Sequence, residues 1–498
     1  MPLKLKPLKY LLSVLTLLAG TQAATAQGLF GFPLGPQQET LDPMEQLGRE
    51  LFNDTNLSTP PGQGCVTCHA PEVGFVSPNF FVNQFFGPHF GAIPHRFGPR
   101  KPPSAAYAGD SPDLRFVADP AFAVNWEGGV FWDGRAAGQL PLFPESDDSP
   151  EFDPLAEQAL FPFLNPVEQN VANEKIVVRK VAFSRYRRLF LQVWGRGSLD
   201  FQDDEVVARA YDRIVTSIAA FERSSEVNPY SSKFDAWLAG EAELTEQEKL
   251  GLWLFENPFD GQSLLTPNED EGRTAFPQGN QGKGRCGVCH SELPGPNDEP
   301  PLFTDFAYHN LGLPKNPDNP FYFMPRRFNP DGRDFIDRGL APTLETIGQP
   351  DNWTPSGAIT SWQEEIDNAE GRHKTPTLRN VNKRPFPGFV KAYMHHGGLK
   401  SMKEVVHFYN TRDVPEEAWG EPEVDFGNIT GGIVGDLGLT DEEEDAIVAF
   451  MATLSDGYQS PPSGPQLPQL PQLPTPPSPP SLPTLPSPPS LPTILPFP

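Results

Sequence analysis

Apolar residues recur at helical spacing in two similar stretches, one in each half of the chain. Residues 47–52 read Leu-Gly-Arg-Glu-Leu-Phe, and residues 250–255 read Leu-Gly-Leu-Trp-Leu-Phe. In both stretches the spacing predicts a helix with one apolar face, and a loop that contains glycines follows. The repetition indicates two similar units in tandem, each with helices packed around its own core.

Two further helices, and the start of the helix in the second repeat, are marked by their faces or by their first residues. Residues 203–222 are predicted to form a helix with one apolar face. Its members are Val206, Val207, Ala210, Ile214 and Ile218. Thr245, with Glu248 three residues later, has the pattern of a capping box at the start of the second repeat. Thr440 precedes five acidic residues and an apolar run that ends at Met451, which predicts a capped helix whose carboxylates suit the positive end of its dipole.

Long segments without helical periodicity separate these elements. Residues 80–100 are rich in aromatic residues, glycine and proline, and residues 294–367 are rich in proline, asparagine and glycine. Both segments are therefore predicted to be irregular loops. The predicted fold class is mainly α with long irregular loops. We place the first unit at residues 27–235 and the second at residues 236–458.

The two ends of the chain belong to neither unit. Three lysines precede an apolar run over residues 10–19, and Ala24-Thr25-Ala26 offers a cleavage site, which predicts a signal peptide over residues 1–26. The apolar run is too short to span a bilayer. Residues 459–498 carry no charge and repeat Pro-Gln-Leu-Pro and Pro-Ser-Leu-Pro units. This composition favours polyproline II and predicts a disordered tail, which serves as a stiff tether or as a docking segment.

Acidic residues outnumber basic ones, 64 to 38, and give the chain a net charge of −26. Nucleic-acid phosphates require a basic face, so this charge argues against a nucleic-acid partner. It is compatible with a basic protein partner. A solvated acidic surface that keeps the protein soluble is the simpler explanation.

All four cysteines lie in two Cys-x-x-Cys-His motifs, so none is left for a disulfide. The motifs consist of Cys65, Cys68 and His69, and of Cys286, Cys289 and His290. Zinc sites and thioredoxin-like redox pairs also use Cys-x-x-Cys, but two copies that each end in histidine favour covalent haem c. In such a motif the thiols bond the porphyrin vinyl groups, and the histidine is the proximal iron ligand. The sequence thus predicts two covalently bound haem c groups.

Attachment of c-type haem is expected outside the cytoplasmic membrane. The two motifs therefore also predict a periplasmic or extracellular protein.

Five further sequence blocks occur in a fixed order between residues 41 and 454. They are Trp132-Asp133-Gly134-Arg135, Gln158 with Asn165-Pro166-Val167-Glu168, Pro376-Thr377-Leu378-Arg379-Asn380, Tyr393-Met394-His395-His396-Gly397 and Phe408-Tyr409-Asn410. With the two haem motifs, these blocks resemble the bacterial di-haem cytochrome c peroxidase family, which includes MauG-type enzymes. The resemblance implies two cytochrome c-like haem domains in tandem. It also implies that the first haem reacts with peroxide and that the second passes electrons in.

The resemblance also implies roles for individual residues. Glu168 would move a proton from the near to the far peroxide oxygen, so that water leaves. Gln158 and Pro162 would shape the same pocket. Trp132 would lie between the two haems and relay electrons.

The distal ligand of the second haem is Met or Tyr in members of this family, fourteen residues beyond the histidine of the Tyr-x-His-x-Gly block. Counting from His395 leads to Tyr409. A phenolate stabilises ferric and higher iron states, so a tyrosine ligand points to the MauG-type branch. Met402 and Met394 are the alternatives.

The distal side of the first haem has two candidate ligands in the loop after the first motif, His89 and His95. Family members that need reductive activation place a histidine there, and we take His89 as the candidate ligand. MauG-type members leave this iron five-coordinate. Either histidine is equally compatible with an ordinary loop position.

The chain departs from the family pattern at two places that concern an inter-domain calcium ion. The family's Arg-Asn before a Pro-Thr pair reads Arg100-Lys101-Pro102-Pro103 here, so a side chain that helps to bind calcium is missing. The loop over residues 382–392 is longer than usual and lacks the expected proline before Tyr393. Both departures argue against bound calcium.

The expected function is reduction of hydrogen peroxide to water with electrons from a small redox protein, a c-type cytochrome or a cupredoxin. One alternative is a MauG-type oxidase that uses peroxide to oxidise a protein or another large substrate. A second alternative is an electron-transfer cytochrome without catalysis. The resemblance leaves open whether the protein forms a homodimer.

Overall fold

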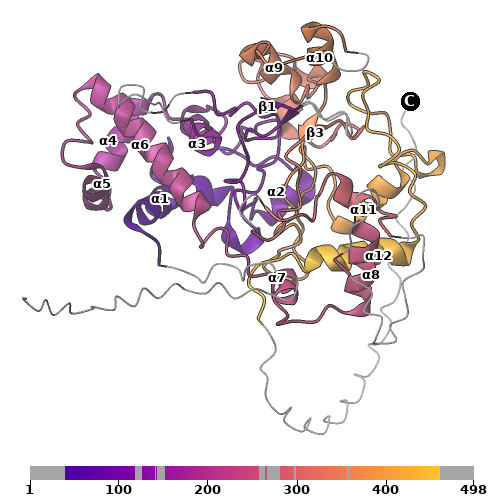
Figure 1. Cartoon of the computed structure of the whole chain (residues 1–498). Helices are drawn as coiled ribbons and strands as arrows, with labels where there is room; N and C mark the ends of the chain where they lie inside the picture. The colour runs from indigo at the N-terminus through magenta and orange to yellow at the C-terminus, as the bar shows by residue number, and fades with distance from the viewer. Residues whose placement is uncertain are drawn as a thin grey trace, which may run out of the picture. The chain divides into compact units, whose positions relative to one another are not determined.

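The computed structural model describes residues 40–117, 126–140, 142, 152–256, 264–265, 281–295, 299–355 and 359–459. The predicted signal peptide and all but the first residue of the predicted tail lie outside these ranges. The described residues are mainly helical, as predicted, with a few two-residue strands (Figure 1). The α-helices are α1 (Pro43–Asn53), α2 (Phe80–Phe85), α3 (Pro154–Leu164), α4 (Glu174–Ala182), α5 (Arg187–Trp194), α6 (Asp204–Arg223), α7 (Lys233–Leu238), α8 (Glu246–Phe255), α9 (Ala341–Ile347), α10 (Trp362–Asn368), α11 (Met402–Thr411) and α12 (Asp441–Ala452).

Two helices begin at the caps that the sequence predicts, and α6 begins at the predicted start of its helix. Asp203 caps α6 through hydrogen bonds from the backbone N–H groups of the first turn. Thr245 and Glu248 form a capping box at α8, and Thr440 forms one with Glu443 at α12. Each cap satisfies N–H groups that have no partner inside the helix, and such caps stabilise a helix by about 1 kcal/mol each.

Each repeat supplies one helix of a closely packed pair, α1 with α6 and α8 with α12 (Figure 1). Gly48 of α1 lies directly against the Ser217 carbonyl, and a Cβ at Gly48 would lie 2.7 Å from the Cβ of Phe221. Gly251 of α8 lies in the same way against the Ala446 carbonyl, and a Cβ there would lie 2.8 Å from the Cβ of Phe450. The backbones approach so closely that only glycine fits. The division into two haem domains stays a prediction, and these matching crossings support it.

Two large clusters of buried apolar side chains lie in the described residues. The first draws on residues 47–230 together with Leu302, and the second on residues 234–454. The first cluster ends and the second begins close to residue 235, where the boundary between the two units is predicted. The boundary itself stays a prediction. No helix in the described part of the chain has both the length and the apolar character needed to cross a membrane.

Short strands fold the middle of the chain back on itself. Strand β1 (Arg115–Phe116) pairs antiparallel with β2 (Trp126–Glu127), and β3 (Tyr308–His309) pairs antiparallel with β4 (His373–Lys374). In the second pair His309 lies opposite His373. The insertion is thereby held against the block that leads into the Pro-Thr-Leu-Arg-Asn sequence.

Both predicted irregular loops contain helices. In the first loop, α2 begins after Asn79, whose side-chain oxygen accepts a hydrogen bond from the backbone N–H of Val82 at 3.0 Å. In the second, α9 and α10 form, and Ser361 starts α10 with a capping box to Glu364. These helices have six or seven residues. A helix that short rests on a cap and on tertiary contacts, which periodicity does not detect.

Candidate haem sites

A cavity in the first half of the protein is lined by the first Cys-x-x-Cys-His motif and by the residues predicted to handle peroxide. The predicted residues on its wall are Cys65, Cys68, His69, His89, Trp132, Gln158, Pro162 and Glu168. They come from segments up to about a hundred positions apart in the sequence, and the fold brings them to one site. His95 is exposed and does not line this cavity.

His69 follows the short 3-10 helix η1 (Cys65–Thr67) and is half-buried. Its Nδ1 lies 3.0 Å from the Phe75 carbonyl oxygen. A carbonyl only accepts, so Nδ1–H donates, and the lone pair that can bind iron stays on Nε2. Burial lowers the pKa of His69 to about 4, so the imidazole is neutral near pH 7, as a metal ligand must be.

The second motif repeats this arrangement in the other half. His290 follows the 3-10 helix η3 (Cys286–Val288), and its Nδ1 donates to the Phe303 carbonyl oxygen at 2.9 Å. Burial lowers the pKa of His290 as well. Each site therefore offers two thiols and one neutral imidazole with its Nδ1 already bonded, a donor set that fits a covalent haem c.

Glu168 is held by the turn that ends α3. The Asn165 carbonyl accepts the Glu168 backbone N–H at 3.0 Å, and the Asn165 side-chain amide donates to Glu168 Oε1 at 2.8 Å. The Asn-Pro-x-Glu block is thus a local turn that fixes its own carboxylate. Burial raises the pKa of Glu168, and the Arg135 guanidinium opposes that shift.

A second carboxyl group, that of the buried residue Glu222, lines the same cavity near the end of α6. Its Oε2 has no hydrogen-bond partner, and burial raises its pKa to about 8. The sequence analysis missed this residue. The available signal was its spacing, because Glu222 lies four positions after Ile218 and so continues the apolar face of the helix.

Trp132 lies where the two candidate haem sites approach each other, since it lines both cavities. Its indole N–H donates to the Lys101 carbonyl oxygen at 3.0 Å, and the Lys101 ammonium lies 5.3 Å from the ring centroid. Lys101 also lines both cavities. This placement suits the predicted relay role of Trp132, which stays a prediction.

The second cavity contains all three candidates for the distal ligand of its haem. Tyr409 of α11, Met394 and Met402 line it together with Cys286, Cys289 and His290. Burial raises the pKa of Tyr409, so its phenol is neutral unless a cation such as ferric iron stabilises the phenolate. Tyr409 stays the predicted ligand, and the two methionines stay the alternatives.

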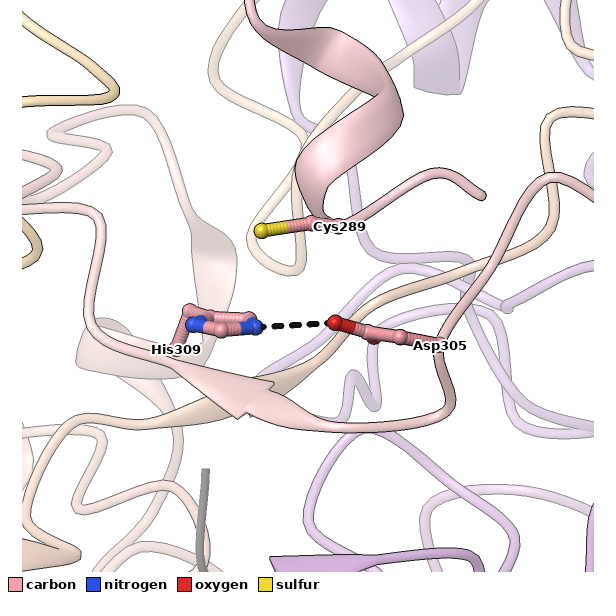
Figure 2. Close-up of side chains that lie close together, drawn as sticks. All are labelled: Cys289, Asp305 and His309. Carbon is pink, nitrogen blue, oxygen red and sulfur yellow. Dashed lines mark hydrogen bonds and ion pairs between the residues drawn. The ribbon is translucent and has the colours of Figure 1, made fainter. Parts of the chain in front are cut away.

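Two further side chains lie next to the second haem motif, and the sequence analysis did not select them. Figure 2 shows Cys289, Asp305 and His309 facing one another, and His309 Nε2 lies 3.3 Å from Asp305 Oδ2. Their ligand atoms are close enough to hold a metal ion. Because Cys289 is one of the thiols predicted to attach haem, we count this group as part of the second haem site. No motif marks Asp305 or His309 within the proline-rich insertion.

A buried ionic network connects the family blocks beside Trp132. Arg100 contacts Asp337 through Nη2 and Oδ1 at 2.6 Å, and contacts Asp133 through Nη1 and Oδ2 at 2.6 Å. His373 stacks on His395 with ring centroids 3.6 Å apart. Both histidines and Asp337 line the second cavity. The ligand atoms of these three residues are close enough to one another to hold a metal ion, but Arg100 already neutralises the Asp337 carboxylate.

Comparisons with known proteins all lead to di-haem peroxidases and MauG proteins. The family model of di-haem cytochrome c peroxidases matches residues 42–243. The methylamine utilization protein MauG of Paracoccus denitrificans is 30% identical over 433 residues, which cover 84% of this chain and 90% of that protein. The cytochrome-c peroxidase IdrP2 of Denitromonas iodatirespirans is 24% identical over 446 residues, which cover 89% of each chain.

A solved structure has the same fold. The diheme peroxidase BthA from Burkholderia thailandensis superimposes with a TM-score of 0.60 and 26% identity, over 86% of this chain and 91% of that chain. The matching family is one of oxidoreductases that act on peroxide, and its description implies two haem c groups. The chain therefore belongs to the di-haem cytochrome c peroxidase family that includes MauG.

Proposed function

We propose that the protein reduces hydrogen peroxide to two molecules of water in the first cavity. The reaction consumes two protons and two electrons per peroxide, and a small redox protein, a c-type cytochrome or a cupredoxin, supplies the electrons. Haem iron, when bound, supplies the redox chemistry that breaks the O–O bond. The observation that carries the proposal is a half-buried carboxyl group, Glu168, in the cavity that also contains His69.

Glu168 is proposed to take the proton from the near peroxide oxygen and to return it to the far one. The far oxygen then leaves as water rather than as hydroxide. A raised pKa suits this task, because a carboxyl group titrating closer to the working pH both accepts and releases a proton readily. The Asn165 amide orients the carboxyl group. Gln158 on the same wall offers an amide to bind the peroxide oxygens.

Electrons are proposed to enter through the second site and to reach the first through Trp132. Support comes from the position of the indole, which lines both cavities and is 7% exposed. The signal pattern and the two haem motifs support export to the periplasm or the extracellular space.

The proposal is tested with purified protein that carries its haem. Absorption and EPR spectra establish the spin state of each iron before and after partial reduction. Reduced c-type cytochrome and peroxide are then mixed, and we expect two molecules of cytochrome to be oxidised per peroxide consumed. Two low-spin irons in every redox state and no consumption of peroxide would instead support an electron-transfer cytochrome.

A MauG-type oxidase is the second candidate, favoured by Tyr409 in the second cavity and by the 30% identity to MauG. Stoichiometric peroxide, added without a donor, then produces a spectral change that persists for minutes. In an ordinary peroxidase this change decays quickly. The same sample thus separates the two functions.

Tyr409→Phe tests the ligand on which this second candidate depends. Removal of the phenol oxygen is expected to change the absorption and EPR spectra of the second haem, since Tyr409 would hold its iron through that oxygen. Tyr393→Phe is the matched control, because Tyr393 lines the same cavity and its hydroxyl lies 3.3 Å from Arg384 Nη2. An unchanged spectrum in Tyr409→Phe leaves Met394 or Met402 as the ligand.

A further inference from the structure

Two lysines, the half-buried Lys101 and the buried Lys391, lie at the two places where the sequence departs from the calcium-binding pattern. Lys101 occupies the first departure, and Lys391 belongs to the 382–392 loop, which is the second. Both side chains line the second cavity, and Lys101 also lines the first. The two departures therefore place two positive charges in one region of the protein.

Lys101 is fixed between the two cavities by its backbone and by Trp132. Its N–H donates to the His395 carbonyl oxygen at 2.9 Å, and its carbonyl accepts the indole N–H of Trp132. Its ammonium donates to the Pro102 carbonyl oxygen at 3.2 Å. Among the ion pairs of the described residues, Arg100 and not Lys101 pairs with the neighbouring Asp133 and Asp337. Burial lowers the pKa of the Lys101 ammonium to about 8.

Lys391 is similarly placed, and it has no carboxylate partner within the part of the chain that the structure describes. It is 4% exposed, and its ammonium donates to the carbonyl oxygens of Val73 at 2.9 Å and Asn380 at 3.0 Å. Burial lowers the pKa of Lys391, and repulsion from Lys101 adds to the shift. The two ammonium groups are therefore near enough to interact.

Buried ammonium groups without an anion are unfavourable, so their retention points to an anionic partner. A haem c brings two carboxylates into each cavity. A calcium ion in the same region would be repelled by both ammonium groups. The donor set here is therefore unsuited to calcium and suited to haem carboxylates.

We infer that Lys101 is the resident cation between the two haem sites, where it pairs with haem carboxylates and, together with Lys391, replaces a bound divalent ion. The protein then needs no calcium for its haem environment. This inference rests on haem being bound in both cavities, and not on the reaction that the haems catalyse.

The test uses purified protein that carries both haems. Metal analysis is expected to find no stoichiometric calcium, and EGTA followed by added calcium is expected to leave the absorption spectrum and both haem reduction potentials unchanged. In Lys101→Met both potentials shift to more negative values, because a positive charge that favours the reduced irons is lost. Lys101→Arg, which keeps the charge, retains the wild-type potentials.

Lys175→Met is the control, since Lys175 is 48% exposed and pairs with Asp204 on the surface. Its potentials are expected to equal those of the wild type. Stoichiometric calcium whose removal shifts the potentials would overturn the inference, as would a Lys101→Met variant with unshifted potentials. If Lys101→Met fails to bind haem, the metal analysis and the EGTA titration of the wild type decide alone. None of these measurements depends on peroxide turnover, so the proposed function can fail separately.

Discussion

Replacement of Glu168 by glutamine is expected to lower kcat for peroxide reduction by about 10²- to 10⁴-fold, the usual contribution of a general acid–base group. The amide has nearly the same shape as the carboxyl group, and it can still contact Asn165, but it cannot carry a proton between the peroxide oxygens. Haem content and both reduction potentials are expected to stay close to those of the wild type. Steady-state oxidation of a reduced c-type cytochrome by peroxide measures the effect.

Glu222→Gln is the matched comparison, because the carboxyl group of the buried residue Glu222 lines the same cavity. We expect Glu222→Gln to retain far more activity than Glu168→Gln. Glu174→Gln, at an exposed position of α4, controls for loss of one surface charge. A large loss in Glu222→Gln with little loss in Glu168→Gln would reassign the proton-carrying group.

Arg379→Met is expected to lower the free energy of unfolding by about 3–5 kcal/mol, the usual effect of removing one partner from a buried ion pair. The Arg379 side chain is 0% exposed and contacts Asp235 Oδ2 at 2.7 Å. It also donates to the Pro301 carbonyl oxygen at 2.7 Å, and its guanidinium lies 5.0 Å from the centroid of the Tyr230 ring. Methionine would leave the Asp235 carboxylate buried and uncompensated. Denaturant unfolding of the protein with its haem measures the change.

Two further variants distinguish the effect of breaking the buried ion pair from the effect of removing any arginine. Adding Asp235→Asn to Arg379→Met is expected to restore part of the stability, because no buried charge is then left unpaired. Arg185→Met removes an arginine that is 80% exposed and pairs with Glu50, so it should destabilise by less than about 1 kcal/mol. Equal losses in Arg379→Met and Arg185→Met would show that the buried pair contributes little.

The sequence was most informative where structure depends on residues close together in the chain. The caps at Thr245 and Thr440 act within a few residues, and each begins a helix as expected. The glycines at 48 and 251 sit in the two similar stretches and mark the two helix crossings. The Cys-x-x-Cys-His motifs are equally local, because one short helical turn brings the thiols and the imidazole together.

The remaining features depend on contacts between distant segments, and periodicity carries no information about these. Arg379 and Asp235 are 144 positions apart, and Arg100 and Asp337 are 237 apart. His309 lies opposite His373 only through the pairing of β3 with β4. Glu168 could be selected only through its sequence block, since an isolated glutamate is usually exposed. The resemblance to a known family therefore identified Glu168, which spacing and composition could not do. It did not indicate that Lys101 and Lys391 lie in one region.

The most direct test of the account is the number of haems that stay attached to the denatured chain. The purified protein is unfolded in acid and denaturant, its mass is measured, and its haem is quantified by pyridine haemochrome absorption. The account predicts a chain heavier by two haem groups and two haemochromes per polypeptide. A chain that keeps one haem, or that releases haem on denaturation, would contradict it.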